Sequence, residues 1–173
     1  MHRISQLLQR MLAWMLIVVM GFSVLNVLWQ VFTRFVLNNP SSYTEELARY
    51  LLVWVGVLAA AYGVATKGHL AIDLLPLKLH GRKRQILEVF IQLSVAAFAV
   101  AVMIVGGIRL VGITLYLDQT SAALGVKLGY VYLVLPISGF LMLYFSVVHL
   151  VDALRSPVEG RATGEDAAVH TID

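Results

Sequence analysis

Residues 11–33 read MLAWMLIVVMGFSVLNVLWQVFT and contain no Asp, Glu, Lys or Arg. The hydrocarbon core of a bilayer is about 30 Å thick, and an α-helix needs about 20 apolar residues to cross it. The hydrophobic part of a cleaved signal peptide has only about 7–15 residues and ends at small residues. This block is longer and is followed by Arg34, so it predicts a transmembrane helix that is retained.

Three further apolar blocks follow, at residues 47–66, 86–108 and 130–151. The chain of 173 residues is 60% hydrophobic and 13% charged, whereas soluble proteins carry about 25% charged residues. Backbone polar groups surrounded by lipid must find partners within the chain, so each block is expected to be helical. We predict an all-α integral membrane protein, in which residues 11–151 form one domain of four transmembrane helices.

Most Lys and Arg residues fall in three segments, which are residues 1–10, the connection between the second and third blocks, and the end of the chain. Cytoplasmic connections of membrane proteins are enriched in Lys and Arg, so both termini are predicted to be cytoplasmic. The tail, residues 152–173, is rich in Gly, Ala and charged residues and is expected to be disordered. The net charge of +3 fits this topology and contact with membrane lipids, with no nucleic acid as a partner.

Motifs for catalysis are missing from the sequence. The chain has no cysteine, which excludes disulfides, Fe–S clusters and thiol nucleophiles. It contains no phosphate-binding loop, no dinucleotide-binding glycine pattern and no nucleophile elbow. We therefore expect no enzymatic activity, no catalytic residues, no cofactor and no metal site.

Asn26, Gln30 and Arg34 recur every four residues and share one face of the first helix. Polar groups in a membrane are costly unless they meet protein or water. Three interpretations remain open for this face: packing within the chain, contact with another membrane subunit, or a path for a solute. An interhelical hydrogen bond contributes about 0.6–2 kcal/mol, so these residues are expected to orient the packing rather than drive it.

The start of the second helix is the most polar stretch beside the apolar blocks. Ser41, Ser42 or Thr44 can cap this helix, and Glu45 and Glu46 fall in its first turn, where the helix dipole favours acids.

Arg49 is within reach of both glutamates along the helix, which predicts an ion pair inside the chain. The alternatives are a docking surface for a partner, or acid–base chemistry and ion binding. Trp54 lies about two turns inside the second helix, too deep for an interfacial residue, and is expected to pack against another helix.

His69 and Asp73 are four residues apart in the connection after the second block. This spacing suits a hydrogen bond, a metal site or a proton relay. A metal site needs three or four ligands, and His80 is the only other obvious candidate nearby. His149 is alone inside a block, which disfavours a haem held by two histidines. We expect a hydrogen bond between His69 and Asp73 that fixes the structure of the connection.

The order of these motifs resembles the small membrane subunit, of the DctQ type, of tripartite ATP-independent periplasmic (TRAP) transporters. The likeness covers about residues 10–150, and the ordered combination carries it rather than any single motif. The matching residues are Arg34-Phe35-Val36-Leu37-Asn38, Glu45-Glu46-Leu47-Ala48-Arg49-Tyr50, Trp54, Gly56, Gly63, Gly68-His69, Asp73, Gln119, Leu124-Gly125 and Tyr132-Leu133-Val134-Leu135-Pro136.

This resemblance implies a non-catalytic subunit in a bacterial inner membrane. Its partners would be a large membrane subunit that performs sodium-coupled, elevator-type transport, and a periplasmic binding protein that delivers an organic anion such as a carboxylate. The small subunit would be a scaffold for the large one and would help to dock the binding protein. The residues expected at the subunit interface are Asn26, Gln30, Arg34, Glu45, Glu46, Arg49 and Trp54.

Two other functions stay open on the residues alone. One is a membrane anchor in a redox complex, which the scarcity of histidines inside the blocks disfavours. The other is a small transporter that works as a homo-oligomer. Many complete transporters contain inverted repeats, and the two halves of this chain do not match each other.

Overall fold

The computed structural model describes residues 2–39, 41–66 and 82–155, and within these ranges the chain is almost entirely helical. The expected loop residues His69 and Asp73 lie outside the described residues. Four stretches are long and apolar enough to cross a membrane, which confirms the predicted fold class. The helices are α1 (His2–Phe35), α2 (Ser42–Ala65), α4 (Arg82–Phe98), η1 (Ala99–Gly106), α5 (Gly107–Tyr116), α6 (Leu128–Tyr132) and α7 (Val134–Arg155).

Several helices extend beyond the apolar blocks that predicted them. α2 begins at Ser42 instead of residue 47, because Ser41 already has the extended backbone of a helix N-cap, with φ of −90° and ψ of 108°. The third span does not end at residue 108 but continues as α5 to Tyr116, since residues 110–116 contain no helix-breaking proline. α7 continues to Arg155, so the first residues of the expected tail are helical.

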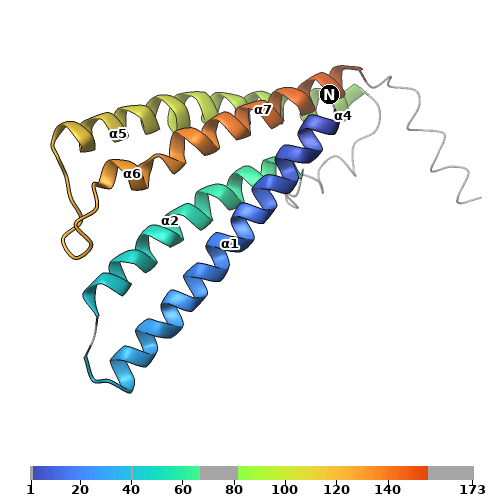
Figure 1. Ribbon diagram of the computed structural model, residues 1–173. Coiled ribbons are helices and arrows are strands. Elements are labelled where there is room, and N and C mark those ends of the chain that lie inside the picture. The colour runs from blue at the N-terminus through green and yellow to red at the C-terminus, as the bar shows by residue number, and fades with distance from the viewer. Residues whose placement is uncertain (1, 40, 67–81, 156–173) are drawn as a thin grey trace, which may run out of the picture.

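The four spans form a wedge with two arms (Figure 1). One arm is the antiparallel pair of α1 and α2. The other arm consists of the third span, built from α4, η1 and α5, packed against the fourth span, built from α6 and α7. α2 packs against both α1 and α7, which makes α2 and α7 the inner helices of the molecule.

The arms converge at the end that holds the start of α1 and the end of α7 (Figure 1). The apolar core joins both arms, with Leu12 of α1, Leu58 of α2, and Met142 and Phe145 of α7 all at most 6% exposed. At the other end the arms diverge, and the loop between α5 and α6 reaches from one arm toward the start of α2. We call these two regions the closed end and the open end.

Small residues allow the third and fourth spans to approach closely. A Cβ atom at Gly139 would lie 2.7 Å from Cβ of Met103, and one at Gly107 would lie 3.0 Å from Cδ of Pro136. Pro136 has no N–H, and its ring displaces the carbonyl of the residue four positions earlier. The fourth span is accordingly interrupted at Leu133, between α6 and α7.

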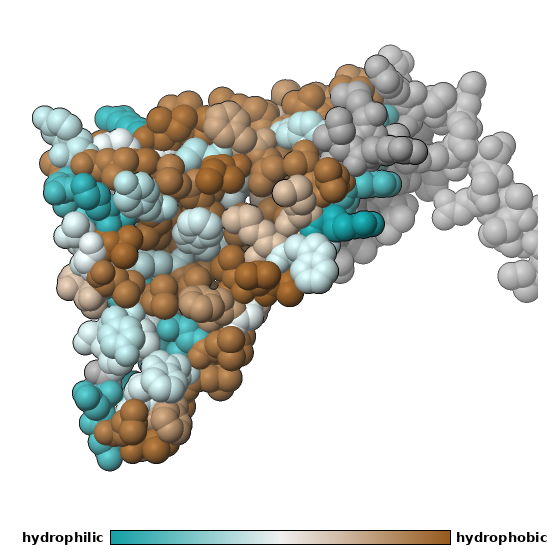
Figure 2. Space-filling view, in the orientation of Figure 1, coloured by the Kyte–Doolittle hydropathy of each residue, from teal (hydrophilic) through white to brown (hydrophobic). Residues whose placement is uncertain are grey.

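Large apolar side chains cover much of the outside of both arms. On the face in Figure 2, hydrophobic residues extend along the arms, and teal residues gather mainly toward the ends. Phe22 and Leu25 of α1 are 53% and 64% exposed, and Ile108 of α5 is 54% exposed. Such a surface suits lipid or another membrane protein rather than water.

Candidate interaction surface

The polar residues singled out in the sequence gather at the open end, around the start of α2. Asn26 of α1 donates a hydrogen bond from Nδ2 to the backbone carbonyl of Thr44 over 2.8 Å, and both residues are buried. The Thr44 hydroxyl donates in turn to the carbonyl of Ser41 over 2.8 Å. Ser41 occupies the N-cap position, but its side chain makes no capping hydrogen bond. Asn26 therefore ties α1 to the first turn of α2 within the chain.

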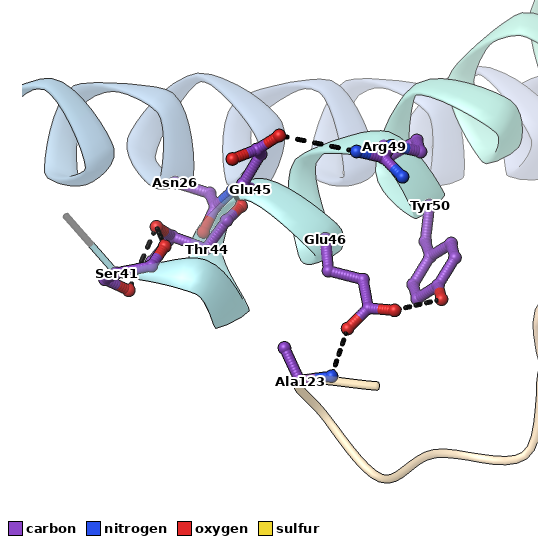
Figure 3. A network of polar contacts seen from close by, with 8 residues as sticks. All are labelled: Asn26, Ser41, Thr44, Glu45, Glu46, Arg49, Tyr50 and Ala123. Atoms are coloured by element: carbon purple, nitrogen blue, oxygen red, sulfur yellow. Dashed lines mark hydrogen bonds and ion pairs between the residues drawn. The ribbon is translucent and has the colours of Figure 1, made fainter. Parts of the chain in front are cut away.

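Glu46 connects the two arms at the open end (Figure 3). Its Oε2 atom accepts hydrogen bonds from the backbone N–H groups of Ala123, over 2.8 Å, and Leu124, over 3.2 Å. Its Oε1 atom accepts a hydrogen bond from the hydroxyl of Tyr50 over 2.7 Å. A carboxylate that accepts three hydrogen bonds in this way is held in one orientation, so Glu46 fixes the loop between α5 and α6 against α2.

That loop folds back on itself as a short hairpin. Thr120 and Lys127 form an antiparallel bridge, and the N–H of Ser121 donates to the carbonyl of Val126 over 2.8 Å. Gly125 has a φ of +65°, a backbone conformation that side chains disfavour. The hairpin thus presents the N–H groups of its tip toward α2, where Glu46 accepts them.

An exposed ion pair closes the base of the hairpin. The Lys127 ammonium lies 2.9 Å from a carboxylate oxygen of Asp118, and both side chains are largely exposed. The hydrogen bond and the negative charge of Asp118 raise the pKa of Lys127 above its ordinary value. Solvent and salt screen an exposed pair of this kind, so its contribution is small.

A second polar contact joins the arms deeper in the molecule. The Nε1 atom of Trp54 donates a hydrogen bond to the backbone carbonyl of Val131 over 2.9 Å. Val131 lies in α6, close to the interruption of the fourth span at Leu133. The expected packing of Trp54 against another helix is confirmed, and the partner is the interrupted fourth span.

One face of α2 stays exposed although this helix packs against both α1 and α7. It consists of Glu45, Arg49, Leu52, Gly56 and Ala60, which follow the helical period on one face. Arg49 pairs with Glu45 over 3.4 Å, which confirms the predicted ion pair inside the chain. A Cβ atom at Gly56 would meet no atom within 4 Å. We call these five residues the α2 stripe.

The candidate residues therefore separate into two groups. Asn26, Glu46 and Trp54 have polar groups that bond within the chain. Four others present their side chains at least partly outward, and these are Gln30, Arg34, Glu45 and Arg49. The sequence did not reveal the backbone donors of Ala123 and Leu124, and the only local signal was the four-residue spacing of Glu46 and Tyr50. Among the described residues, no group of three His, Cys, Asp or Glu side chains is arranged to hold a metal.

Comparison with known proteins places this architecture in a family. The sequence profile described as tripartite ATP-independent periplasmic transporters, DctQ component, matches residues 23–156. The chain is 31% identical over 78 residues to the sialic acid TRAP transporter small permease protein SiaQ of Vibrio cholerae, which is 45% of each chain. It is 34% identical over 104 residues to the C4-dicarboxylate TRAP transporter small permease protein DctQ of Rhodobacter capsulatus, covering 59% of this chain and 44% of that protein.

A longer relative matches as well. The chain is 29% identical over 115 residues to the sialic acid TRAP transporter permease protein SiaT of Haemophilus influenzae, covering 66% of this chain and 18% of that protein. In each of these three comparisons the alignment spans less than half the length of the relative.

Proposed function

The chain belongs to the DctQ component family of the tripartite ATP-independent periplasmic transporters, and from this premise we propose that it is the small permease subunit of such a transporter. It is a multi-pass membrane protein, and we place it in the bacterial inner membrane. Its task in this proposal is to hold a large permease subunit in position. Family membership together with a largely exposed apolar surface supports this role.

The longer relatives support a tight association with a large subunit. SiaT and the isethionate TRAP transporter permease protein DctMQ of Oleidesulfovibrio alaskensis align with this chain over only 18% and 16% of their lengths. A region similar to this chain is therefore joined to a much longer chain in those proteins. A covalent connection keeps two regions at high local concentration, which suits parts that work in contact.

The α2 stripe is the observation that carries the proposed interface. α2 lies between α1 and α7, so the stripe is on an inner helix rather than at the edge of the molecule. Gly56 and Ala60 let another helix approach the backbone closely, which is how membrane helices associate where lipid provides no hydrophobic driving force. Glu45 and Arg49 at the head of the stripe offer charges that fix the register of the partner. Gln30 and Arg34 on α1 extend the proposed interface.

The transport chemistry follows from the family in this proposal and not from a site in this chain. The relatives named for sialic acid and C4-dicarboxylates suggest an organic carboxylate as the transported solute. We assign coupling to sodium and movement of the solute to the large subunit, and delivery of the solute to a periplasmic binding protein. The open end, with its fixed hairpin, is the part of this chain that we expect to help dock the binding protein.

Co-purification of matched glycine variants tests the interface. We expect Gly56→Leu to reduce recovery of the large subunit in mild detergent by about tenfold, because the leucine keeps the partner helix away from the backbone. Gly21→Leu is the control, since Gly21 is also exposed and a Cβ there also meets no atom within 4 Å, but it lies on α1. Equal recovery with both variants, while both remain folded by circular dichroism, would contradict an interface on the α2 stripe.

A further inference from the structure

A crevice of about 730 Å³ opens between the two arms at the open end. It lies between the end of α1, the connection to α2 and the tip of the hairpin. The residues that line it are Trp29, Thr33, Leu37, Asn39, Ser41, Ser42, Tyr43 and Ala123. Its size is within the range of about 300–1,000 Å³ that is typical of sites for small molecules.

The position of the crevice along α1 places it at the boundary of the hydrocarbon layer. The uncharged block of α1 ends at Arg34. Trp29 lies five residues before Arg34, about 7 Å deeper along the helix, and Leu37 and Asn39 lie beyond it. Tryptophan is enriched at this depth of a membrane, where headgroups meet acyl chains. The crevice therefore spans the zone between apolar and polar layers of one leaflet.

The lining combines apolar and polar side chains. Trp29 and Leu37 provide apolar contact, whereas the hydroxyl of Ser42 and the amide of Asn39 provide hydrogen-bonding groups. Both of these polar side chains are exposed and make no hydrogen bond to another residue that the structure describes. No Lys, Arg, Asp or Glu lines the crevice, so a small multivalent ion would lack a counter-charge there.

We propose that this crevice binds one phospholipid, with the phosphate and glycerol ester groups near Asn39 and Ser42 and the upper acyl chain against Trp29. Neutral donors suit the ester and phosphate oxygens, and the open side of the crevice lets the acyl chains continue into the bilayer. The bound lipid fills the space between the α1–α2 arm and the tip of the hairpin. None of the residues that line the crevice belongs to the α2 stripe.

Photo-crosslinking of the purified full-length chain tests the proposal. The probe is phosphatidylethanolamine with a diazirine in its headgroup, present as a small fraction of phosphatidylethanolamine and phosphatidylglycerol vesicles. We expect crosslinks to concentrate in residues 29–43 and at the hairpin. Ala123→Phe fills the crevice and is expected to reduce these crosslinks by about tenfold. Ala122→Phe is the matched control, because Ala122 is exposed on the same hairpin but does not line the crevice.

Ser42→Phe fills the crevice from the start of α2 and provides a second variant that leaves the hairpin sequence unchanged. Loss of the crosslinks with Ala123→Phe and with Ser42→Phe, together with unchanged crosslinks in Ala122→Phe, would support the site. Crosslinks spread evenly over the exposed faces of α1 and α5, or equal labelling in all variants, would overturn it. The proposal also fails if the crosslinks disappear when the chain is purified together with its large subunit, since a protein segment would then occupy the crevice.

Discussion

The closed end and the open end of the wedge are held together by different chemistry. At the closed end, both arms contribute apolar side chains to one core, and Leu58 and Phe145 are almost completely buried. At the open end, single polar contacts connect the arms, from Glu46 to the hairpin and from Trp54 to Val131. Apolar packing distributes its stabilisation over many atom contacts, whereas a polar contact depends on one or a few hydrogen bonds. The two ends are therefore expected to respond differently to a single substitution.

The largest expected effect is at the closed end. Phe145 is 2% exposed and contacts the core that joins the arms. Phe145→Ala should lower the free energy of unfolding by about 3 kcal/mol, the lower limit for a buried phenylalanine, because lipid rather than water surrounds the helices. Equilibrium unfolding in mixed micelles measures this change. Phe140→Ala on the same helix is the control, since Phe140 is 57% exposed and should have little effect.

The next effect is local and falls on the open end. Glu46→Gln keeps the size of the side chain but removes the charge that accepts the N–H groups of Ala123 and Leu124. Amide hydrogen exchange in the hairpin, residues 117–127, should accelerate by about tenfold, while exchange in the core of α7 stays unchanged. Glu45→Gln is the comparison, because Glu45 pairs with Arg49 and does not contact the hairpin. Equal acceleration by both variants would show that the loss of charge alone matters.

A smaller effect is expected between the arms. Trp54→Phe keeps an aromatic ring but removes the hydrogen bond to the carbonyl of Val131. The free energy of unfolding should fall by about 1 kcal/mol, as for a single hydrogen bond within a membrane protein. Trp14→Phe on the exposed side of α1 should leave it unchanged. A loss above that of Phe145→Ala would mean that this one polar contact stabilises the protein more than the apolar core does.

The smallest effect belongs to Lys127 and Asp118. Asp118 raises the pKa of Lys127. The stabilisation that this pair gives the folded state is therefore complete below the ordinary lysine pKa of 10.5 and is lost as pH rises through the higher value in the folded state. The contribution of this pair to the thermal unfolding midpoint of the protein should therefore stay constant between about pH 7 and pH 9. A double-mutant cycle with Lys127→Met and Asp118→Asn should give a small coupling that decreases in high salt.

The sequence was sufficient for the features that depend on composition or on neighbouring positions. Long uncharged blocks predicted the four spans, because only a helix satisfies the backbone in lipid. The four-residue spacing of Glu45 and Arg49 predicted their ion pair, and the depth of Trp54 predicted contact with another helix.

Features that depend on distant parts of the chain could not be predicted in the same way. Glu46 and Ala123 are 77 residues apart, and the donor is a backbone N–H whose direction depends on the hairpin. The role of Asn26 was left open among packing, subunit contact and a path for a solute, since an amide on a helix face suits each of them. The third apolar block ends at residue 108, before Arg109, but one charge beside apolar residues does not stop a helix, and α5 continues to Tyr116.

The divergence of the arms also has a consequence for the bilayer. Two arms that separate from one end to the other cannot both run parallel to the membrane normal, so at least one must be tilted. The outline of the protein is then wider at the open end than at the closed end.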